Sequence, residues 1–380
     1  MEKKLGHRIL EIGSLFLKLG IIAFGGPAAH IALMQKEVIE KRKWMTDQHY
    51  LDLIGITSLV PGPNSTEMVM HCGKERGGIA GLFVAGAAFI IPAVLITLGM
   101  AMLYNSYADN QYVAPWIYGI KAGVIALILS AVIKLAKKAV KNWVLGTIGA
   151  LALVAGLLGQ NEILVILCAG LLNLGVKQFK MAPSFIVPFA LLNIAPAANS
   201  GSATYLKVFL IFLKMGSVLF GSGYLLFAYL DTELVQNLEW ITRDQLAEAV
   251  AVGNITPGPV LSTATFIGYE IKGVWGAGLA TLGIFLPSFI IIMIISPFIP
   301  KLRNSKTARA LINGINVGAL TMMIVVTYKL GIELLVDWQS ITIFVAAAAT
   351  MIFYSKINSF VFIGGCSLLG FLLYLIPPIL

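Results

Sequence analysis

Charged residues are scarce in this chain: they make up 12% of its 380 residues, against about 25% in soluble domains. Hydrophobic residues make up 58%, and so much apolar surface cannot be hidden in one soluble core. This balance excludes an ordinary soluble domain. Apolar runs of about 20 residues, long enough to cross about 30 Å of hydrocarbon, recur along the sequence. We therefore predict a bundle of membrane helices.

Cysteine and the common catalytic motifs are also lacking. Cys72, Cys168 and Cys366 are widely separated and show no CxxC or Cys/His spacing, so we predict no metal site. The absence of a GxxxxGK(S/T) run excludes ATP hydrolysis by this chain. Without HExxH, GxSxG or paired acidic motifs, neither a hydrolase nor a Mg²⁺-dependent membrane transferase is indicated. We expect no enzyme and no cofactor.

The formal net charge of +9 would indicate a nucleic-acid partner in a soluble protein. Here, however, the lysines and arginines lie in short gaps between apolar runs, where membrane proteins carry their topology signals. We expect membrane lipid, and no nucleic acid, among the partners.

The sequence contains an internal repeat. Residues 16–20 (FLKLG) recur as residues 212–216 (FLKMG), 196 residues later. The same shift relates further segments: 44–46 (WMT) to 240–242 (WIT), and the Pro-Gly-Pro of 61–63 to that of 257–259. After these the shift becomes 195 and maps Pro92 onto Pro287, and Trp143 onto Trp338. We predict two copies of one unit, at 1–180 and 205–380, joined by a linker at 181–204.

Basic residues indicate that the two copies are inverted. Residues 36–43 hold four lysines and arginines, whereas the equivalent loop of the second copy is mainly acidic. Short basic loops face the cytoplasm, so the two loops should face opposite sides. Inversion requires an odd number of crossings per copy, and we predict five. They are 12–34, 78–104, 115–133, 143–158 and 162–176, and then 205–229, 274–300, 311–328, 338–354 and 359–376.

Five crossings with residues 36–43 inside would place Lys3, Lys4 and Arg8 outside. This conflicts with the preference of basic residues for the cytoplasm. The orientation of the first helix and the exact number of spans therefore stay open.

Each Pro-Gly-Pro interrupts an apolar, helical stretch. Proline lacks an N–H donor and clashes with the preceding turn, so the helix should break there. The arms on either side have about ten residues, too few to span a bilayer. We predict that 46–73 and 242–268 are re-entrant hairpins of two half-helices, one in each copy.

Helix N-termini at these breaks are candidates for binding an anion, because they present free N–H groups and the positive end of the helix dipole. Broken helices in inverted repeats are typical of secondary-transporter sites. The substrate-binding candidates here are Pro61, Gly62, Pro63, Asn64, Ser65, Thr66, Pro257, Gly258, Pro259, Ser262 and Thr263. Ordinary helix capping and packing also explain such polar residues, and this alternative stays open.

Two further groups of residues are candidates for substrate binding. One lies in the glycine-rich breaks of the first helices: Gly25, Gly26, Gly221 and Ser222. The other consists of lysines within apolar runs: Lys18, Lys214 and Lys121. Glycine allows close approach of a ligand, and an ionisable group inside a membrane is a functional candidate. Plain helix crossing and lysine snorkelling are the alternatives. Glu67 is the one carboxylate well inside a predicted break, which gives proton coupling by paired carboxylates little support.

Residues 24–34 (FGGPAAHIALM), with Trp44 and residues 61–66 (PGPNST) beyond them, resemble the chromate ion transporter family. Residues 254–260 (NITPGPV) and 262–269 (STATFIGY) resemble its C-terminal half. The resemblance covers nearly the whole chain. It implies the two-domain form of the family, which moves chromate, and also sulfate, across the bacterial inner membrane, usually outward. The second copy lacks the full Gly-Gly-Pro at 221–223, so the equivalence of the two first-helix breaks is in doubt.

We therefore expect an all-α integral membrane protein that is a secondary transporter of small divalent oxyanions, with chromate first and sulfate second. Efflux would be driven by the membrane potential or by exchange. A passive anion channel and a membrane-embedded protein acting on lipid are the alternatives. Homodimer formation, the physiological anion, the direction and the coupling ion stay open.

Overall fold

The computed structural model describes residues 2–24, 26–57, 62–107, 110, 112–179, 202–219, 223, 225–295, 305–354 and 357–374. Within these ranges every regular element is a helix. Four helices are long and apolar enough, by length and composition, to cross a membrane: Asn64–Tyr107, Ala114–Ala139, Val260–Ile294 and Lys306–Leu334. The chain is an all-α, multi-pass membrane protein, as predicted.

The helices form two series along the chain. The first comprises α1 (Glu2–Ile22), α2 (Gly26–Gln35), the π-helix η1 (Lys36–Lys41), α3 (Asp47–Thr57), α4 (Asn64–Tyr107), α5 (Ala114–Ala139), α6 (Trp143–Leu157) and α7 (Glu162–Phe179). The second comprises α8 (Tyr205–Val218), α9 (Leu225–Leu230), the π-helix η4 (Asp231–Asn237), α10 (Arg243–Ile255), the 3₁₀ turn η5 (Val260–Ser262), α11 (Thr263–Ile295), α13 (Lys306–Leu334), α14 (Trp338–Phe353) and α15 (Ser359–Tyr374). Apart from η5, the second series follows the first element by element.

The longest helix of each series has a kink at an equivalent glycine. Gly78 in α4 has φ 63° and ψ −151°, and Gly273 in α11, 195 residues later, has φ 61° and ψ −154°. Glycine adopts such angles because it has no Cβ. Each kink separates a half-helix, 64–77 or 263–272, from a longer segment. The predicted spans at 78–104 and 274–300 begin at these kinks.

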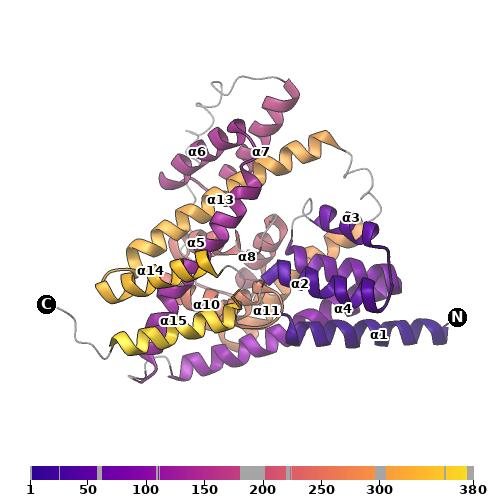
Figure 1. The fold of residues 1–380 in the computed structure, drawn as a ribbon, viewed down its shortest axis with the longest axis horizontal. Helices are drawn as coiled ribbons and strands as arrows, with labels where there is room; N and C mark the ends of the chain where they lie inside the picture. Colours follow the sequence, from indigo (N-terminus) through magenta and orange to yellow (C-terminus); the bar gives the residue numbers. More distant parts are fainter. Residues whose placement is uncertain are drawn as a thin grey trace.

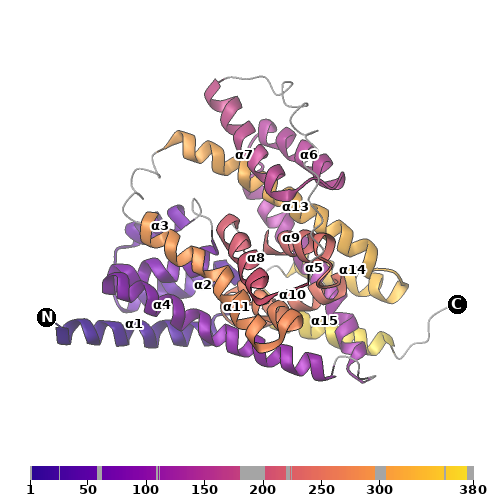
Figure 2. The same ribbon diagram turned by 180° about the vertical axis from the view of Figure 1, so that it is seen from behind.

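Close helix pairs also occur at equivalent positions. The helix α1 packs along α4, and α8 packs along α11 (Figures 1 and 2). A Cβ on Gly20 would lie 2.7 Å from the Phe89 carbonyl oxygen, and one on Gly216 would collide with the Ile284 carbonyl. The absence of a side chain at these glycines is what lets the backbones approach, as in other membrane helix pairs.

The last two helices of each series pack on the central helix of the other series. Both α14 and α15 contact α5, whereas α6 and α7 contact α13 (Figure 1). Equivalent glycines mark these contacts: Gly119 meets the Cys366 carbonyl, and Gly314 meets the Ala169 carbonyl. The Tyr118 hydroxyl of α5 also donates a hydrogen bond to Asp337, the residue that caps α14. The two series are therefore interlocked.

Two predicted crossings are interrupted, and three others lie where predicted but are short for a membrane span. The runs 12–34 and 205–229 are not single helices, because α1 ends at Ile22 and α8 ends at Val218 before α2 and α9 begin. The helices α6, α14 and α15 have 15, 16 and 16 residues. At 1.5 Å per residue, 16 residues extend about 24 Å, less than the hydrocarbon thickness of about 30 Å. The number of crossings therefore stays a prediction.

Gly314→Ala should destabilise the fold, because the added methyl group would meet the Ala169 carbonyl of α7. We expect a loss of about 1–3 kcal/mol, the usual cost of overpacking, measured as a lower thermal midpoint in detergent. Gly331→Ala is the matched control in the same helix, since nothing lies within 4 Å of its Cβ position. Its midpoint should stay the same or rise, because alanine favours helix over glycine. Equal midpoints for the two variants would contradict the close packing of α13 on α7.

Candidate functional site

The two Pro-Gly-Pro segments are breaks between helices, as predicted. In the first series α3 ends at Thr57 and α4 begins at Asn64; in the second, α10 ends at Ile255 and η5 begins at Val260. Both central glycines have positive φ, 146° at Gly62 and 86° at Gly258. Residues with a Cβ rarely adopt these values, which explains glycine at these two turns.

Each break is hydrogen-bonded to the end of the first helix of the other series. The Gly62 N–H donates to the Leu219 carbonyl at 2.5 Å, and the Gly258 N–H donates to the Ala23 carbonyl at 3.0 Å. Leu219 follows α8 and Ala23 follows α1, again 196 residues apart. The last carbonyls of a helix have no partner within it, and here each break supplies one. The end of the first helix of each series and the Pro-Gly-Pro turn of the other series therefore come together.

Both breaks also press against the long helix of the other series. A Cβ on Gly62 would lie 2.8 Å from Ser288 Oγ in α11, and a Cβ on Gly258 would lie 2.9 Å from the Ala93 Cβ in α4. Ala93 and Ser288 are equivalent and directly follow Pro92 and Pro287. Ser288 was not among the predicted residues, although the repeated proline beside it is a signal that could have found it.

Polar groups at the first break lack partners within the described part of the chain. Thr66 Oγ1, both carboxylate oxygens of Glu67, and Ser288 Oγ are buried without a hydrogen bond. Buried polar atoms are normally satisfied, so a group of unsatisfied ones indicates a place for water or a ligand. A Cβ on Gly62 would collide with the Glu67 carboxylate, which is therefore turned toward the break.

The second break is internally satisfied. Thr263 Oγ1 donates to the Val260 carbonyl at 2.8 Å, and Thr256 and Ser262 share a hydroxyl contact at 3.4 Å. The capping alternative raised from the sequence therefore describes Thr263 well. The two breaks are alike in backbone and different in polar side chains.

His30 adds a group near the second break. Its Nε2 lies 3.0 Å from the Ala23 carbonyl, the same oxygen that accepts from Gly258. The ring packs edge-on against Phe89, with 5.5 Å between centroids. His30 thus helps to hold the end of α1 against α4.

The three candidate lysines are not gathered at the breaks. Lys121 binds Asp244 at 2.7 Å and Glu248 at 2.8 Å, which joins α5 to α10. Lys214 pairs with Glu233. Lys18 is exposed on α1, on the same face as exposed Leu17 and Ile21.

An ion pair outside the long helices anchors the basic loop. Glu37 of η1 accepts hydrogen bonds from Lys41, at 2.7 Å, and from Arg42. The hydrogen bond from Lys41, with the hydrogen bond and charge of Arg42, lowers the pKa of Glu37 to about 2. Glu37 is thus ionised at neutral pH and neutralises part of the loop's positive charge.

Of the remaining predicted site residues, some lie within the described part of the chain and some do not. Gly26 begins α2, Pro63 directly precedes α4, and Ser65, Pro257 and Pro259 are buried. Gly25, Pro61, Gly221 and Ser222 lie outside the described residues.

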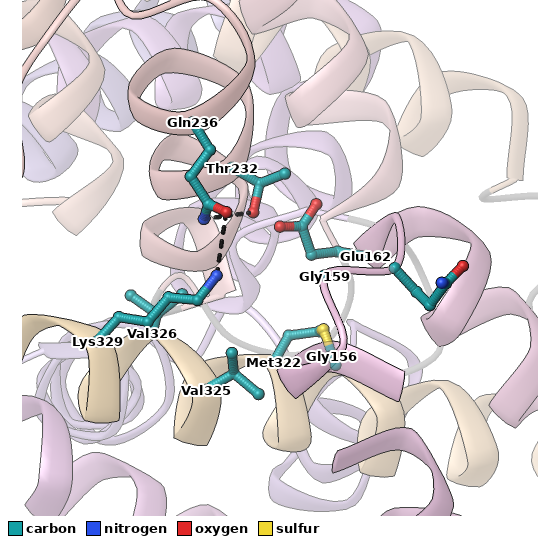
Figure 3. A pocket seen from close by; sticks show the side chains of 10 residues that line it. Gly156, Gly159, Glu162, Thr232, Gln236, Met322, Val325, Val326 and Lys329 are labelled. Carbon is teal, nitrogen blue, oxygen red and sulfur yellow. Dashed lines mark hydrogen bonds between the residues drawn. The ribbon is translucent and has the colours of Figure 1, made fainter. Parts of the chain in front are cut away.

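Two cavities lie away from the breaks. The smaller, of about 20 Å³, lies between the α6–α7 turn, η4 and α13 (Figure 3). There the Glu162 carboxylate is turned toward Thr232 and Gln236, and Lys329 donates to Gln236 at 3.0 Å (Figure 3). Since one water needs about 10–15 Å³, this space does not fit a tetrahedral oxyanion.

The larger cavity, of about 350 Å³, is lined by residues that include Glu239, Arg243 and Glu333. Arg243 already binds Asp231 at 2.8 Å and Glu333 at 2.5 Å. An anion in this cavity would lie near negatively charged carboxylates, and Arg243 is already paired with two of them, Asp231 and Glu333. The paired breaks are therefore the better candidate site.

Known proteins are similar to this chain over nearly its whole length. The sequence model of the family described as "Chromate transporter" matches residues 10–174 and again 206–371. A probable chromate transport protein of Synechococcus elongatus is 29% identical, over 92% of this chain and 97% of its own. A chromate transport protein of Cupriavidus metallidurans is also 29% identical, over 97% of this chain and 94% of its own. An uncharacterized transporter of Bacillus subtilis, 26% identical, aligns over 90% of its own length but only 47% of this chain. No solved structure is significantly similar.

Lys121→Met should destabilise the fold by about 3 kcal/mol, because it removes a cation from Glu248, which is only 5% exposed. The thermal midpoint in detergent measures the loss. The double variant Lys121→Met/Glu248→Gln should recover most of it, since no buried charge is then left unpaired. A single variant as stable as the parent would show that Lys121 does not hold α5 to α10.

Proposed function

The chain belongs to the chromate transporter family, and we propose that it is a secondary transporter of small divalent oxyanions, with chromate as its main substrate and sulfate as its second. It would act in the inner membrane, and the anion would pass where the two Pro-Gly-Pro breaks meet the ends of the first helices.

The pair of crossed hydrogen bonds carries this proposal. Gly62 to Leu219 and Gly258 to Ala23 bring four interrupted helices from both series together. Interrupted backbone inside a membrane is tolerated where protein buries it or where it lines a pathway. In secondary transporters, substrate sites lie at such breaks, between repeats.

The chemistry of the breaks suits an anion that must also be released. The first N–H groups of α4 and α11 lie at the positive ends of the two helix dipoles. The N–H of Thr263 already bonds to carbonyls of η5, so α4 would supply more of the free donors. Hydroxyl and amide groups of Asn64, Ser65, Thr66 and Ser262 would add neutral donors. The binding set we propose is Gly25, Gly26, Pro61, Gly62, Pro63, Asn64, Ser65, Thr66, Gly221, Ser222, Pro257, Gly258, Pro259, Ser262 and Thr263. Because Lys121 and Lys214 are already paired with carboxylates, the proposal does not depend on their charge.

We further propose that residues 1–180 and 205–380 are inverted repeats joined by the linker 181–204. The matched kinks at Gly78 and Gly273 and the family model, which aligns separately with each half, support this division. The Bacillus subtilis relative that aligns with about half of the chain supports it as well. Rocking one repeat against the other would expose the breaks to each side in turn.

Efflux is the direction we propose. Moving one negative charge outward across an inside-negative membrane releases about 2.3 kcal/mol per 100 mV, so a dianion leaves without ATP. Exchange against an external anion is the alternative energy source.

Purified protein in proteoliposomes should take up chromate, and sulfate more slowly, when the lumen is made positive. Uptake should saturate and show counterflow, unlike flux through a channel. Gly258→Ala should lower the initial rate at least tenfold, because its methyl group meets Ala93 at a positive φ. Gly159→Ala is the matched control, with φ 77° and nothing within 4 Å, and should keep most of the rate. Absence of flux of both anions in folded protein would refute the oxyanion assignment.

A further inference from the structure

Glu67 is a carboxyl group enclosed at the first break. Its side chain is 0% exposed, and both oxygens lack a hydrogen bond within the described part of the chain. It lies in the first turn of α4, turned back over Gly62, and Ser288 Oγ of α11, which has no hydrogen bond among the described residues, lies on the same side of the turn. Thr66 Oγ1, beside it in sequence, is also unpaired. These buried polar atoms converge on the place where we put the anion.

Ionisable side chains on the elements around Glu67 are engaged elsewhere or exposed. The described elements that pack most closely against α4 are α1, α2, α3, α10 and α11 with η5. Three ion pairs engage ionisable groups there: Glu11 with Arg76, His49 with Glu75, and Glu248 with Lys121. Two side chains bond to backbone carbonyls instead, His30 to that of Ala23 and Tyr50 to that of Ile31. Lys18 and Lys272 are exposed. Glu270 of α11 interacts with Gln245 and Glu248, and His71 and Cys72 are buried in α4 itself. Within the described residues no cation pairs with Glu67.

The second break has no counterpart of this carboxyl group. The repeat aligns Glu67 with the hydroxyl residues Ser262 and Thr263, which are neutral and already bonded nearby. The two breaks therefore differ by this carboxyl group, which lies on one side of an otherwise matched arrangement.

A bare carboxylate and a divalent anion cannot share this enclosed place. Like charges repel strongly where little water screens them, and an unpaired buried charge is itself costly. A protonated carboxyl group has the opposite effect, since its O–H can donate a hydrogen bond to an anion oxygen. Occupancy by the anion and protonation of Glu67 should thus favour each other.

We propose that Glu67 takes up one proton whenever the site holds the oxyanion, so that one proton and one divalent anion cross together. The proton comes from the water on the side from which the anion enters, and Glu67 releases it on the other side when the anion leaves. The net charge moved is then one negative charge per anion. This inference rests on the proposed function of the same site.

Equilibrium accumulation of chromate in proteoliposomes tests the proposal, at an alkaline pH where free chromate is the dianion. With one net charge, a tenfold change in accumulation requires about 59 mV of imposed potential; with two charges it requires about 30 mV. The wild-type chain should follow the first value, and a one-unit pH gradient should change its accumulation tenfold. A wild-type slope of about 30 mV without any pH response would overturn the proposal and leave the oxyanion assignment intact. Absence of chromate flux would instead refute the proposed function.

Glu67→Gln imitates the protonated carboxyl group. It should still transport chromate, with a slope of about 30 mV per tenfold change and no response to the pH gradient. Glu162→Gln is the matched control, because Glu162 is a buried carboxyl group in the small cavity away from the breaks. It should keep the wild-type slope. A Glu67→Gln variant with wild-type slope and pH response would overturn the proposal. If this variant does not fold, the wild-type measurement decides alone.

Discussion

Backbone hydrogen bonding inside hydrocarbon is the constraint on which the rest of this structure depends. A helix that stops within a membrane leaves carbonyl and N–H groups that lipid cannot satisfy. Four helix ends meet here, and the bonds from Gly62 to Leu219 and from Gly258 to Ala23 each give a carbonyl at the end of a first helix a donor from the opposite break. The two turns require glycine because Gly62 and Gly258 have positive φ. Their close neighbours, Ser288 and Ala93, belong to the long helix of the opposite series. The breaks are thus stable only because both series are present.

Much of this arrangement follows from the amino-acid sequence, because proline and glycine act locally. The helix breaks between Thr57 and Asn64 and between Ile255 and Val260 lie where the repeat predicts them. The kinks at Gly78 and Gly273 were not predicted, although they fall where the predicted spans 78–104 and 274–300 begin. The crossed packing of α14 and α15 on α5 could not be predicted, because a repeat shows which segments are equivalent and not which ones touch. The partners of Lys121 were missed for the same reason: Asp244 and Glu248 lie more than a hundred residues away and carry no local signal.

Symmetry of the backbone does not extend to the polar side chains. The second break satisfies its own hydroxyls, whereas the side chains of Thr66, Glu67 and Ser288 at the first break have no hydrogen bond to any residue that the structure describes. A duplicated scaffold can divide its tasks in this way, with one copy holding the geometry and the other carrying the ionisable chemistry. Substitutions at equivalent positions of the two copies are therefore not equivalent in effect.

The interlocked ends of the two series also set an order for biosynthesis. The helices α14 and α15, which pack on α5, are made about two hundred residues after it. Until α15 has been synthesised, the face of α5 at Gly119 lacks its contacts with Cys366 and Gly370 and remains exposed to lipid. The first series therefore cannot complete its packing before α14 and α15 have been synthesised. A chain cut short before residue 359 lacks α15 and, with it, the contacts of Cys366 and Gly370 at Gly119.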